Sequence, residues 1–272
     1  MSTLYLVATP IGNLEDMSHR AIRILSEVHL IAAEDTRRTR KLLAAYGIKT
    51  PLTSYHGHSD RAKLAHLSKL LEEEDVALVS EAGMPVISDP GYELVKMALE
   101  TGVSVVAVPG PSAVPVALAV SGLPADQFTH LGFLPRKKGD RRRLLGSVVA
   151  EQRTLVMFEA PHRLLASLGD IGDVLGDREI AVCRELTKMH EEVFRGTVMQ
   201  AISHFTHPRG EFTVVISGRR DERRAGTVSD SAMEELRRLR REGVSAKDAV
   251  GQVSQATRLS KKVIYRAWID LA

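Results

Sequence analysis

Residues 79–91 hold the densest group of side chains and backbone sites able to bind a small molecule. An apolar run over residues 76–79 precedes them and predicts a buried strand, and a helix is expected over residues 92–100. Two glycines let the backbone approach a ligand closely, and two prolines stiffen the loop. Ligands of open α/β sheets bind outside the carboxyl ends of the strands. The segment is therefore expected to form part of a small-molecule site. The alternative is a strand-to-helix turn that has no binding role.

Four further loops rich in glycine and proline follow predicted strands, at residues 9–13, 109–113, 132–135 and 159–161. Backbone N–H and C=O groups from several such loops can grip a nucleoside-like ligand. The sequence has no G-x-G-x-x-G after its first strand, no P-loop motif and no G-x-S-x-G elbow. His56 and His58 have no clear third ligand, so no metal site is expected.

The order of apolar and helical segments predicts two α/β domains, over residues 1–122 and 123–220. In the first, strands alternate with helices, which is typical of a parallel, doubly wound sheet. In the second, two strands follow each other with only a short break, which indicates a mixed sheet. The strands are expected at residues 3–8, 29–33, 51–55, 76–79 and 103–108, and then at 128–133, 154–159, 179–185, 190–195 and 211–217.

Residues 221–272 are predicted to form a small helical extension of three helices. Ser231 and Ser245, each followed three residues later by an acid, are expected to cap the first two helices, and Ser260 the third. The break at residues 257–259 matches helix-turn-helix spacing, with a small packing appendage as the alternative. The exposed face of the last helix would then carry three basic side chains placed to contact phosphates: Lys261, Lys262 and Arg266.

Positive charge is concentrated in two segments, although the net charge is only +3. Residues 136–143, read as a basic loop leading into a helix at residue 141, and residues 219–272 each carry a local charge of +5. This distribution favours a polyanion partner, and two solvated surfaces are the alternative. The aromatic fraction of 4% argues against a stacking platform for free single strands.

Composition also bears on the compartment. The single cysteine, Cys183, excludes an internal disulfide and is expected to be a small core residue in a reducing compartment. The N-terminus has no signal-peptide pattern. Residues 103–125 are uncharged and long enough to cross a bilayer, but prolines and glycines break them. They are therefore predicted to form a buried strand, a tight loop and a buried helix.

Seven motifs, taken in order, resemble one known family. Residues 9–14, 32–37, 79–91 and 109–112 are similar to the tetrapyrrole-methylase superfamily. Within it, the chain resembles the ribosomal RNA small subunit methyltransferase I branch through Gly132-Phe133-Leu134-Pro135, His162-Arg163-Leu164-Leu165 and Arg184-Glu185-Leu186-Thr187-Lys188. The resemblance covers essentially the whole chain, including the helical extension.

The resemblance implies a two-domain α/β enzyme that binds S-adenosylmethionine in the cleft between the domains. It implies methyl transfer to the ribose 2′-hydroxyl of a cytidine, position 1402, in the 16S ribosomal RNA of the small subunit. It also implies a homodimer in the cytoplasm, without a metal. By position, the residues implied to hold the cofactor are Pro10, Ile11, Glu81, Gly83, Met84, Ser112, Ala113, Phe158, Glu159, Thr187, Glu211 and Phe212.

The chain departs from the family pattern at two places. Glu81-Ala82-Gly83-Met84-Pro85 stands where the family usually has Asp-Ala-Gly-Thr-Pro, so the carboxylate gains a methylene and a hydroxyl is lost. His58-Ser59-Asp60 stands where the family often has His-Asn-Glu.

A ribose hydroxyl is a poor nucleophile at neutral pH, so a nearby base is expected. Glu34 and Asp35, at the carboxyl end of the second strand, are candidates, and Lys188 and His162 are others. For the two acids, capping of the following helix is an equally valid interpretation. The expected RNA contacts outside the extension are basic residues in two groups: Arg37, Arg38, Arg40 and Lys41, and Arg136, Lys137 and Lys138.

Two other functions remain open from the sequence. The chain could methylate a tetrapyrrole or another small molecule, because such substrates carry carboxylates that also attract basic residues. It could instead be a non-catalytic nucleic-acid-binding module. Removal of residues 219–272 distinguishes an RNA methyltransferase from these alternatives, because only the methylation of RNA is expected to depend on the basic extension.

Overall fold

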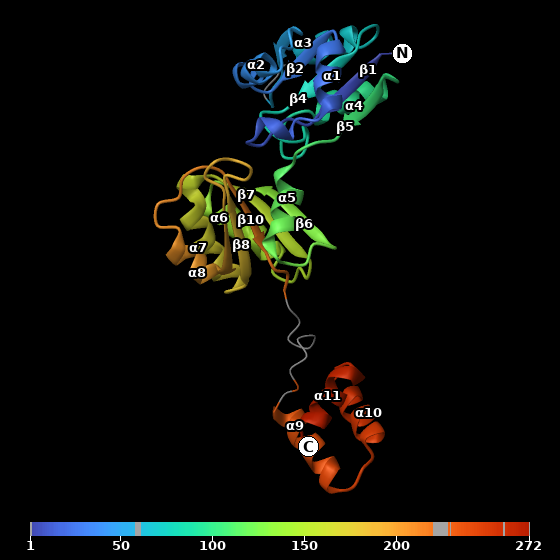
Figure 1. Cartoon of the computed structure of the whole chain (residues 1–272), viewed down its shortest axis with the longest axis vertical. Helices are drawn as coiled ribbons and strands as arrows, with labels where there is room; N and C mark the ends of the chain where they lie inside the picture. The colour runs from blue at the N-terminus through green and yellow to red at the C-terminus, as the bar shows by residue number, and fades with distance from the viewer. Residues whose placement is uncertain (1, 58–60, 220–227, 229, 258, 272) are drawn as a thin grey trace. The chain divides into compact units, whose positions relative to one another are not determined.

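The computed structural model describes residues 2–57, 61–219, 228, 230–257 and 259–271, so His58-Ser59-Asp60 lies outside the described residues. The chain divides into two compact units (Figure 1). The first comprises Met1–Val149 with Arg153–Ser217, and the second comprises Ala150–Gln152 with Gly218–Ala272. Both sheets belong to the first unit. The finer division at residues 122/123 and 220/221 stays a prediction.

The first sheet is parallel throughout, as the alternation of strands and helices predicted. Its strand order is β3-β2-β4-β1-β5. The strands are β1 (Thr3–Val7), β2 (Leu30–Ala33), β3 (Leu52–Ser54), β4 (Val76–Val79) and β5 (Ser104–Val108). The central strand β4 is buried at every residue, which explains its continuous apolar run.

Helices cover both faces of this sheet, which makes it doubly wound. One face packs against α1 (His19–Glu27) and α2 (Thr36–Ala45) through residues such as Leu25 and Leu43. The other face packs against α3 (Arg61–Leu70) and α4 (Tyr92–Glu100) through Leu67 and Leu94. Because every strand runs in the same direction, the loops after β1, β2, β4 and β5 all leave the same edge.

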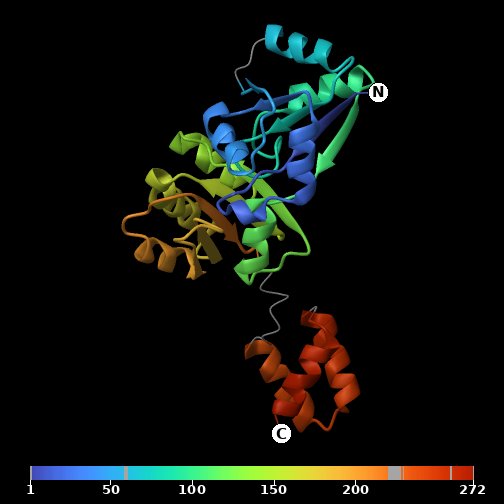
Figure 2. The same ribbon diagram turned by 45° about the horizontal axis from the view of Figure 1, so that its top comes forward.

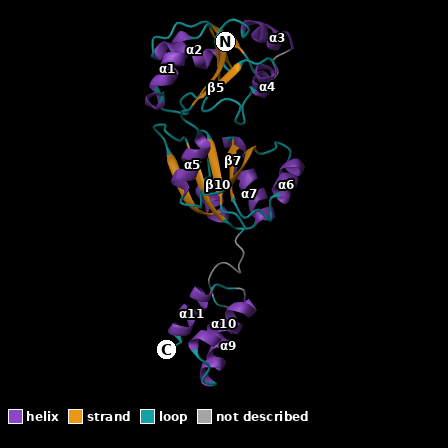
Figure 3. Cartoon of the chain, turned by 90° about the vertical axis from the view of Figure 1, so that its right-hand side faces the viewer, coloured by secondary structure: helices purple, strands orange, loops and turns teal. Residues whose placement is uncertain are grey.

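The second sheet is mixed, as predicted, with the order β6-β7-β10-β8-β9. Only β6 and β7 pair in parallel. The strands are β6 (Phe128–Phe133), β7 (Thr154–Glu159), β8 (Glu179–Arg184), β9 (Glu192–Thr197) and β10 (Phe212–Ile216). Figure 3 shows α5 (Ala113–Ser121) on one face, and α6 (Lys138–Ser147) and α7 (Leu164–Leu175) on the other, where α8 (Val198–His204) also packs.

The uncharged stretch that could be mistaken for a membrane span forms β5, a turn and α5, as predicted. No helix in the described part of the chain is both long and apolar enough to cross a bilayer. Cys183 lies fully buried under α5, which confirms its prediction as a core residue. Burial raises the pKa of its thiol to about 11, so the thiolate is not populated at neutral pH.

The described residues of the second unit form three helices, α9 (Asp230–Arg241), α10 (Ala246–Thr257) and α11 (Lys261–Asp270), around their own apolar core (Figure 2). Ser260 caps α11 by accepting a hydrogen bond from the Val263 N–H, and Ser245 accepts one from the Asp248 N–H. The predicted cap at Ser231 was wrong, because α9 already begins at Asp230 and Ser231 lies inside the helix.

The basic segment at residues 136–143 differs from its prediction as a loop, because α6 already begins at Lys138. Arg141 is only 5% exposed, and its guanidinium binds the buried Asp170 carboxylate of α7 at 2.6 Å. Arg142 also contacts Asp170, at 3.2 Å, and Arg143 pairs with Asp140. Arg141 therefore does not belong to a basic surface available to a polyanion, because its charge is paired with Asp170 inside the protein.

Candidate active site

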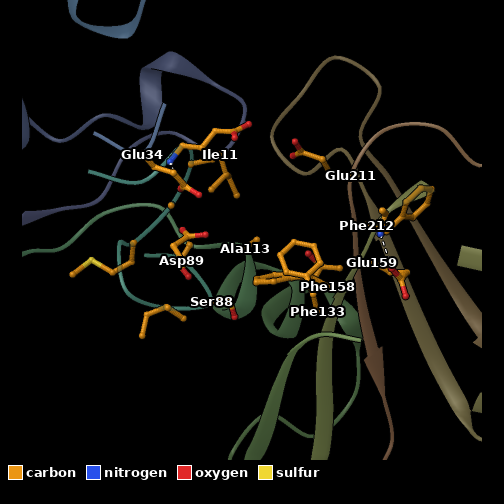
Figure 4. Close-up of a pocket in the computed structure, with 18 of the residues that line it drawn as sticks. Ile11, Glu34, Ser88, Asp89, Ala113, Phe133, Phe158, Glu159, Glu211 and Phe212 are labelled. Atoms are coloured by element: carbon orange, nitrogen blue, oxygen red, sulfur yellow. Dashed lines mark hydrogen bonds between the residues drawn. The ribbon is translucent and has the colours of Figure 1, made fainter. Parts of the chain in front are cut away.

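Loops from both sheets of the first unit enclose a cavity of about 420 Å³ (Figure 4). The first sheet contributes the loops at the carboxyl ends of its strands, and the second contributes the ends of β6, β7 and β10. The lining residues are Ile11, Glu34, Glu81, Ala82, Gly83, Met84, Ile87, Ser88, Asp89, Ser112, Ala113, Phe133, Phe158, Glu159, Ala160, Pro161, Glu211, Phe212 and Thr213. We call this the acid-lined cavity, because five carboxylates face it.

Backbone hydrogen bonds join two of the glycine- and proline-rich loops at the floor of the cavity. The Thr9 N–H donates to the Gly83 carbonyl at 2.9 Å, and the Gly83 N–H donates to the Thr9 carbonyl at 2.9 Å. Gly83 has a φ of +82°, which a residue with a side chain rarely adopts. This conformation brings Gly83 beside Ile11, so the loops after β1 and β4 form one continuous surface.

The loop after β4 carries backbone strain beside the cavity. Val86 has a φ of 76° and Ser88 a φ of 65°, both in the left-handed region that β-branched and other L-residues avoid. Strain of this kind costs on the order of 1–3 kcal/mol per residue and is concentrated at functional sites. A hydrogen bond of 2.9 Å between Ser88 Oγ and His130 Nε2 of β6 ties the strained loop to the second sheet.

Gly91 provides a direct test of this loop, because its φ is +140° and its surroundings leave no room for a Cβ atom. An added Cβ would lie 2.7 Å from Leu78 Cδ2 and 2.8 Å from Val86 Cγ2. We expect Gly91→Ala to lower the free energy of unfolding by about 1–3 kcal/mol, measured by urea denaturation. Gly139→Ala, in α6 with open space around it, is the matched control and is expected to be neutral or stabilising.

Three of the five carboxylates in the cavity are neutralised by cationic partners. Glu81 forms an ion pair with Arg38, and Glu211 accepts a hydrogen bond from Lys188 Nζ at 2.9 Å. Glu159 is 2% exposed and accepts hydrogen bonds from the Ala160 N–H, Arg163 Nε and Ser167 Oγ at 2.5 to 2.8 Å. These partners hold the three side chains in place.

Glu34 and Asp89 differ, because no lysine or arginine within the described chain forms an ion pair with either of them, although the charge of His56 acts on Glu34. Glu34 Oε2 accepts a hydrogen bond of 3.1 Å from the Glu81 N–H. Burial, followed by the charge of Asp35, raises the pKa of Glu34. Burial, followed by the charge of Glu34, raises the pKa of Asp89 to about 6. Such a pair sharing one cavity can take up a proton near neutral pH.

Of the twelve residues that the resemblance implied for the cofactor, ten line the cavity and two, Pro10 and Thr187, do not. The Thr187 hydroxyl is nevertheless buried and has no hydrogen-bond partner among the described residues, and its backbone has a φ of 68°. It lies against Gly12 of the loop after β1. An unsatisfied buried hydroxyl at this point fits a polar ligand group that completes the site.

Three of the four residues expected to act on protons, Glu34, Asp35 and Lys188, occupy different environments. Glu34 lines the cavity. Asp35 caps α2 by accepting hydrogen bonds from the Arg37 and Arg38 N–H groups, the capping role that was left open, and these bonds lower its pKa. Lys188 Nζ binds Glu185 and Glu211, both at 2.9 Å, and lies outside the cavity lining.

Several lining residues were missed. Ser88 and Asp89 lie in the segment at residues 79–91 but were not among the implied cofactor residues, and both line the cavity. Phe133 and Pro161 lie in two of the glycine- and proline-rich segments predicted to contribute to the site, so the composition of these segments was the available signal. Thr213 gave no signal, because a single hydroxyl residue in a buried strand has no distinguishing pattern.

The predicted RNA contacts fall into separate groups. Arg37 and Arg38 lie exposed at the start of α2, with Arg38 bound to Glu81. At the start of α6, the exposed side chains of Arg136, Lys137 and Lys138 form no ion pair within the described chain. In the second unit, Lys261, Lys262 and Arg266 are exposed on α11.

Comparisons with known proteins place the chain in a family. The model of the tetrapyrrole (corrin/porphyrin) methylases matches residues 3–202. A ribosomal RNA small subunit methyltransferase I of Synechocystis is 46% identical over 275 residues, covering 100% of this chain and 99% of the relative. A protein of the same name from Thermotoga maritima is 54% identical over 222 residues, covering 80% of this chain and 100% of the relative.

Solved structures agree with this placement at the level of the fold. A uroporphyrin-III-C-methyltransferase from Thermus thermophilus has a TM-score of 0.54 at 22% identity, covering 79% of this chain and 94% of that one. A second structure of the enzyme, complexed with S-adenyl homocysteine, has a TM-score of 0.54 at 19% identity, covering 80% and 97%. The family model and the full-length relatives together show that the chain belongs to the tetrapyrrole methylases and, within them, to the ribosomal RNA small subunit methyltransferase I family.

Proposed function

We propose that the chain transfers a methyl group from S-adenosylmethionine to the ribose 2′-hydroxyl of a cytidine, position 1402, in the 16S RNA of the small ribosomal subunit. The observation that carries the proposal is the match, over the full length of the chain, to relatives named for methylation of this RNA. The acid-lined cavity and the exposed basic residues of α6 and α11 support it. We also propose a cytoplasmic homodimer without a metal.

The residues of the acid-lined cavity fit S-adenosylmethionine chemically. The cofactor carries a sulfonium and an ammonium cation, and carboxylates stabilise such charges in a cavity with restricted access to water. We assign its binding to the twelve residues from Pro10 to Phe212 named above, including Thr187, whose buried hydroxyl lacks a partner. When bound, the cofactor supplies an activated methyl group.

We propose that Glu34 and Asp89 hold the proton released by the ribose hydroxyl. General base catalysis needs a carboxylate that is unprotonated at working pH but basic enough to accept a proton. Asp89, with a pKa of about 6, meets both conditions, and Glu34 raises that pKa. Asp35 and Lys188 have other partners, so we assign them the roles of capping α2 and of holding Glu185 and Glu211.

The deciding experiment is methylation of purified 30S subunits with labelled S-adenosylmethionine, followed by mapping of the modified nucleotide. We expect label in 16S RNA, on the ribose of one cytidine. Methylation of a tetrapyrrole in place of the 30S subunit would support the small-molecule alternative, and binding without any transfer would support the non-catalytic alternative.

Removal of residues 219–272 tests the role of the helical extension. The family model matches residues 3–202 and ends before the extension, so the extension is not expected to carry the chemistry. We expect the truncated protein to bind S-adenosylmethionine normally, measured by calorimetry, and to show a raised KM for 30S subunits with kcat retained. The double variant Lys261→Gln/Lys262→Gln is a less drastic test of the same role. We expect its RNA binding to depend less on salt concentration than that of the wild-type chain. If the KM for 30S subunits is unchanged in both proteins, the extension does not contribute to RNA binding.

A further inference from the structure

A second hollow, of about 580 Å³, adjoins the acid-lined cavity. It is lined by Phe133, Arg136, Ala160, His162 and Arg163. Phe133 and Ala160 line both spaces, so ligands in the two would be neighbours. We call this second space the basic hollow.

The two spaces have opposite chemical character. Five carboxylates line the acid-lined cavity, whereas the basic hollow has no carboxylate in its lining. Arg163 is committed to the protein, because its guanidinium binds Glu159 at 2.6 Å and the Leu134 carbonyl at 2.5 Å. Arg136 and His162 are exposed, and neither forms an ion pair within the described chain. The hollow therefore offers donors for an anion beside a cavity suited to a cation.

Phe133 presents an aromatic ring at the junction of the two spaces. Phe133 is the last residue of the edge strand β6 and is 58% exposed, which leaves much of a large apolar side chain in contact with solvent. One side is supported by Phe158, with ring centroids 5.3 Å apart. The pairing of β6 with β7 shifts register between His130 and Phe133, and Gly132 has a φ of +65°. Such irregularities redirect side chains near active sites, and here they leave one ring face open.

We propose that the basic hollow binds the target nucleotide of the RNA chain, with the base stacked on Phe133 and the flanking phosphates held by Arg136 and His162. The inference rests on the proposed function and names the substrate site for it. Single-stranded nucleotides are bound in this way, by aromatic stacking together with cationic donors for phosphate. Because the hollow shares Phe133 and Ala160 with the acid-lined cavity, the nucleotide would lie beside the cavity that Asp89 and Glu34 line.

Two variants with matched controls test the site. Phe133→Leu removes the ring and keeps an apolar side chain, and Phe128→Leu, at the other end of β6 and 43% exposed, is its control. Arg136→Gln removes one cation, and Arg143→Gln, exposed on α6, is its control. We expect Phe133→Leu to weaken binding of a short 16S-derived RNA about tenfold or more. Arg136→Gln should lower the slope of log affinity against log salt by about one.

Photocrosslinking locates the base directly. The same RNA, with 5-iodocytidine at the target position, is irradiated with the full chain, and the adduct is mapped by mass spectrometry. We expect the adduct on Phe133. Equal RNA affinity of Phe133→Leu and Phe128→Leu, or an adduct at another residue, would overturn the proposal.

The outcomes separate the two proposals, because binding and crosslinking do not require methyl transfer. A wild-type chain that labels 16S RNA without an adduct on Phe133 contradicts only the nucleotide site. A chain that forms the adduct but does not label 30S subunits contradicts only the proposed function. Melting curves are expected to be unchanged in all four variants, and calorimetry with S-adenosylmethionine is expected to be unchanged in Phe128→Leu, Arg136→Gln and Arg143→Gln, because only Phe133 of the four also lines the acid-lined cavity.

Discussion

Asp89→Asn is expected to slow methyl transfer about 10²- to 10⁴-fold, the usual contribution of a general base. Asparagine keeps the size of the side chain and its hydrogen bond with Ser80 but cannot accept the proton. The affinity for S-adenosylmethionine, measured by calorimetry, should change far less than the rate. Asp126→Asn, an exposed acid elsewhere in the first unit, is the control. A variant with the wild-type rate would exclude Asp89 as the proton acceptor.

The pH dependence provides a second readout for the same residue. The rate of the wild-type protein should rise with pH through about 6, where Asp89 loses its proton, and the variant should lose this rise. Stability should move in the opposite direction. Because the pKa of Asp89 is raised in the folded state, its protonated form contributes stability below about pH 4, and this is lost as pH rises through 6. Above pH 6, Asp89→Asn should therefore be more stable by about 1 kcal/mol, a value discounted for solvent screening of a partly exposed group.

Arg141→Ala is expected to lower the free energy of unfolding by about 3–5 kcal/mol. The guanidinium is 5% exposed, and Nε donates to Asp170 Oδ2 at 2.8 Å. Its loss leaves the Asp170 carboxylate, itself 3% exposed, with the weaker contact of Arg142 at 3.2 Å. A buried charge without its main partner is far more costly than the absence of both partners.

Urea denaturation of three proteins distinguishes this explanation from a simple loss of packing. Arg143→Ala, whose exposed ion pair with Asp140 is worth little, should change stability by less than about 0.5 kcal/mol. The double variant Arg141→Met/Asp170→Leu should be less destabilised than Arg141→Ala, because no buried charge remains. If the double variant loses more stability than the single one, the electrostatic explanation is wrong.

The sequence by itself determined the architecture of the first unit and the region of the site. Alternation of apolar strands with amphipathic helices is a local pattern that predicted the parallel first sheet, and the short break between two successive strands predicted the mixed second sheet. Parallel strands place their following loops at one edge, so the loops after residues 8, 79 and 108 could be expected to meet. Ten of twelve implied cofactor residues accordingly lie in one cavity.

Only the tertiary structure decided which charged groups are free. Arg141 and Asp170 are 29 residues apart, and no local pattern shows that packing of α6 on α7 buries them together. The same holds for residues 79–91, where Ser88 and Asp89 line the cavity because two left-handed residues turn the loop. The periodicity of apolar residues in the sequence shows which face of a helix or strand is buried. The partners, the burial and the direction of a polar side chain depend instead on elements that are distant in the sequence. These determine which carboxylate can accept a proton.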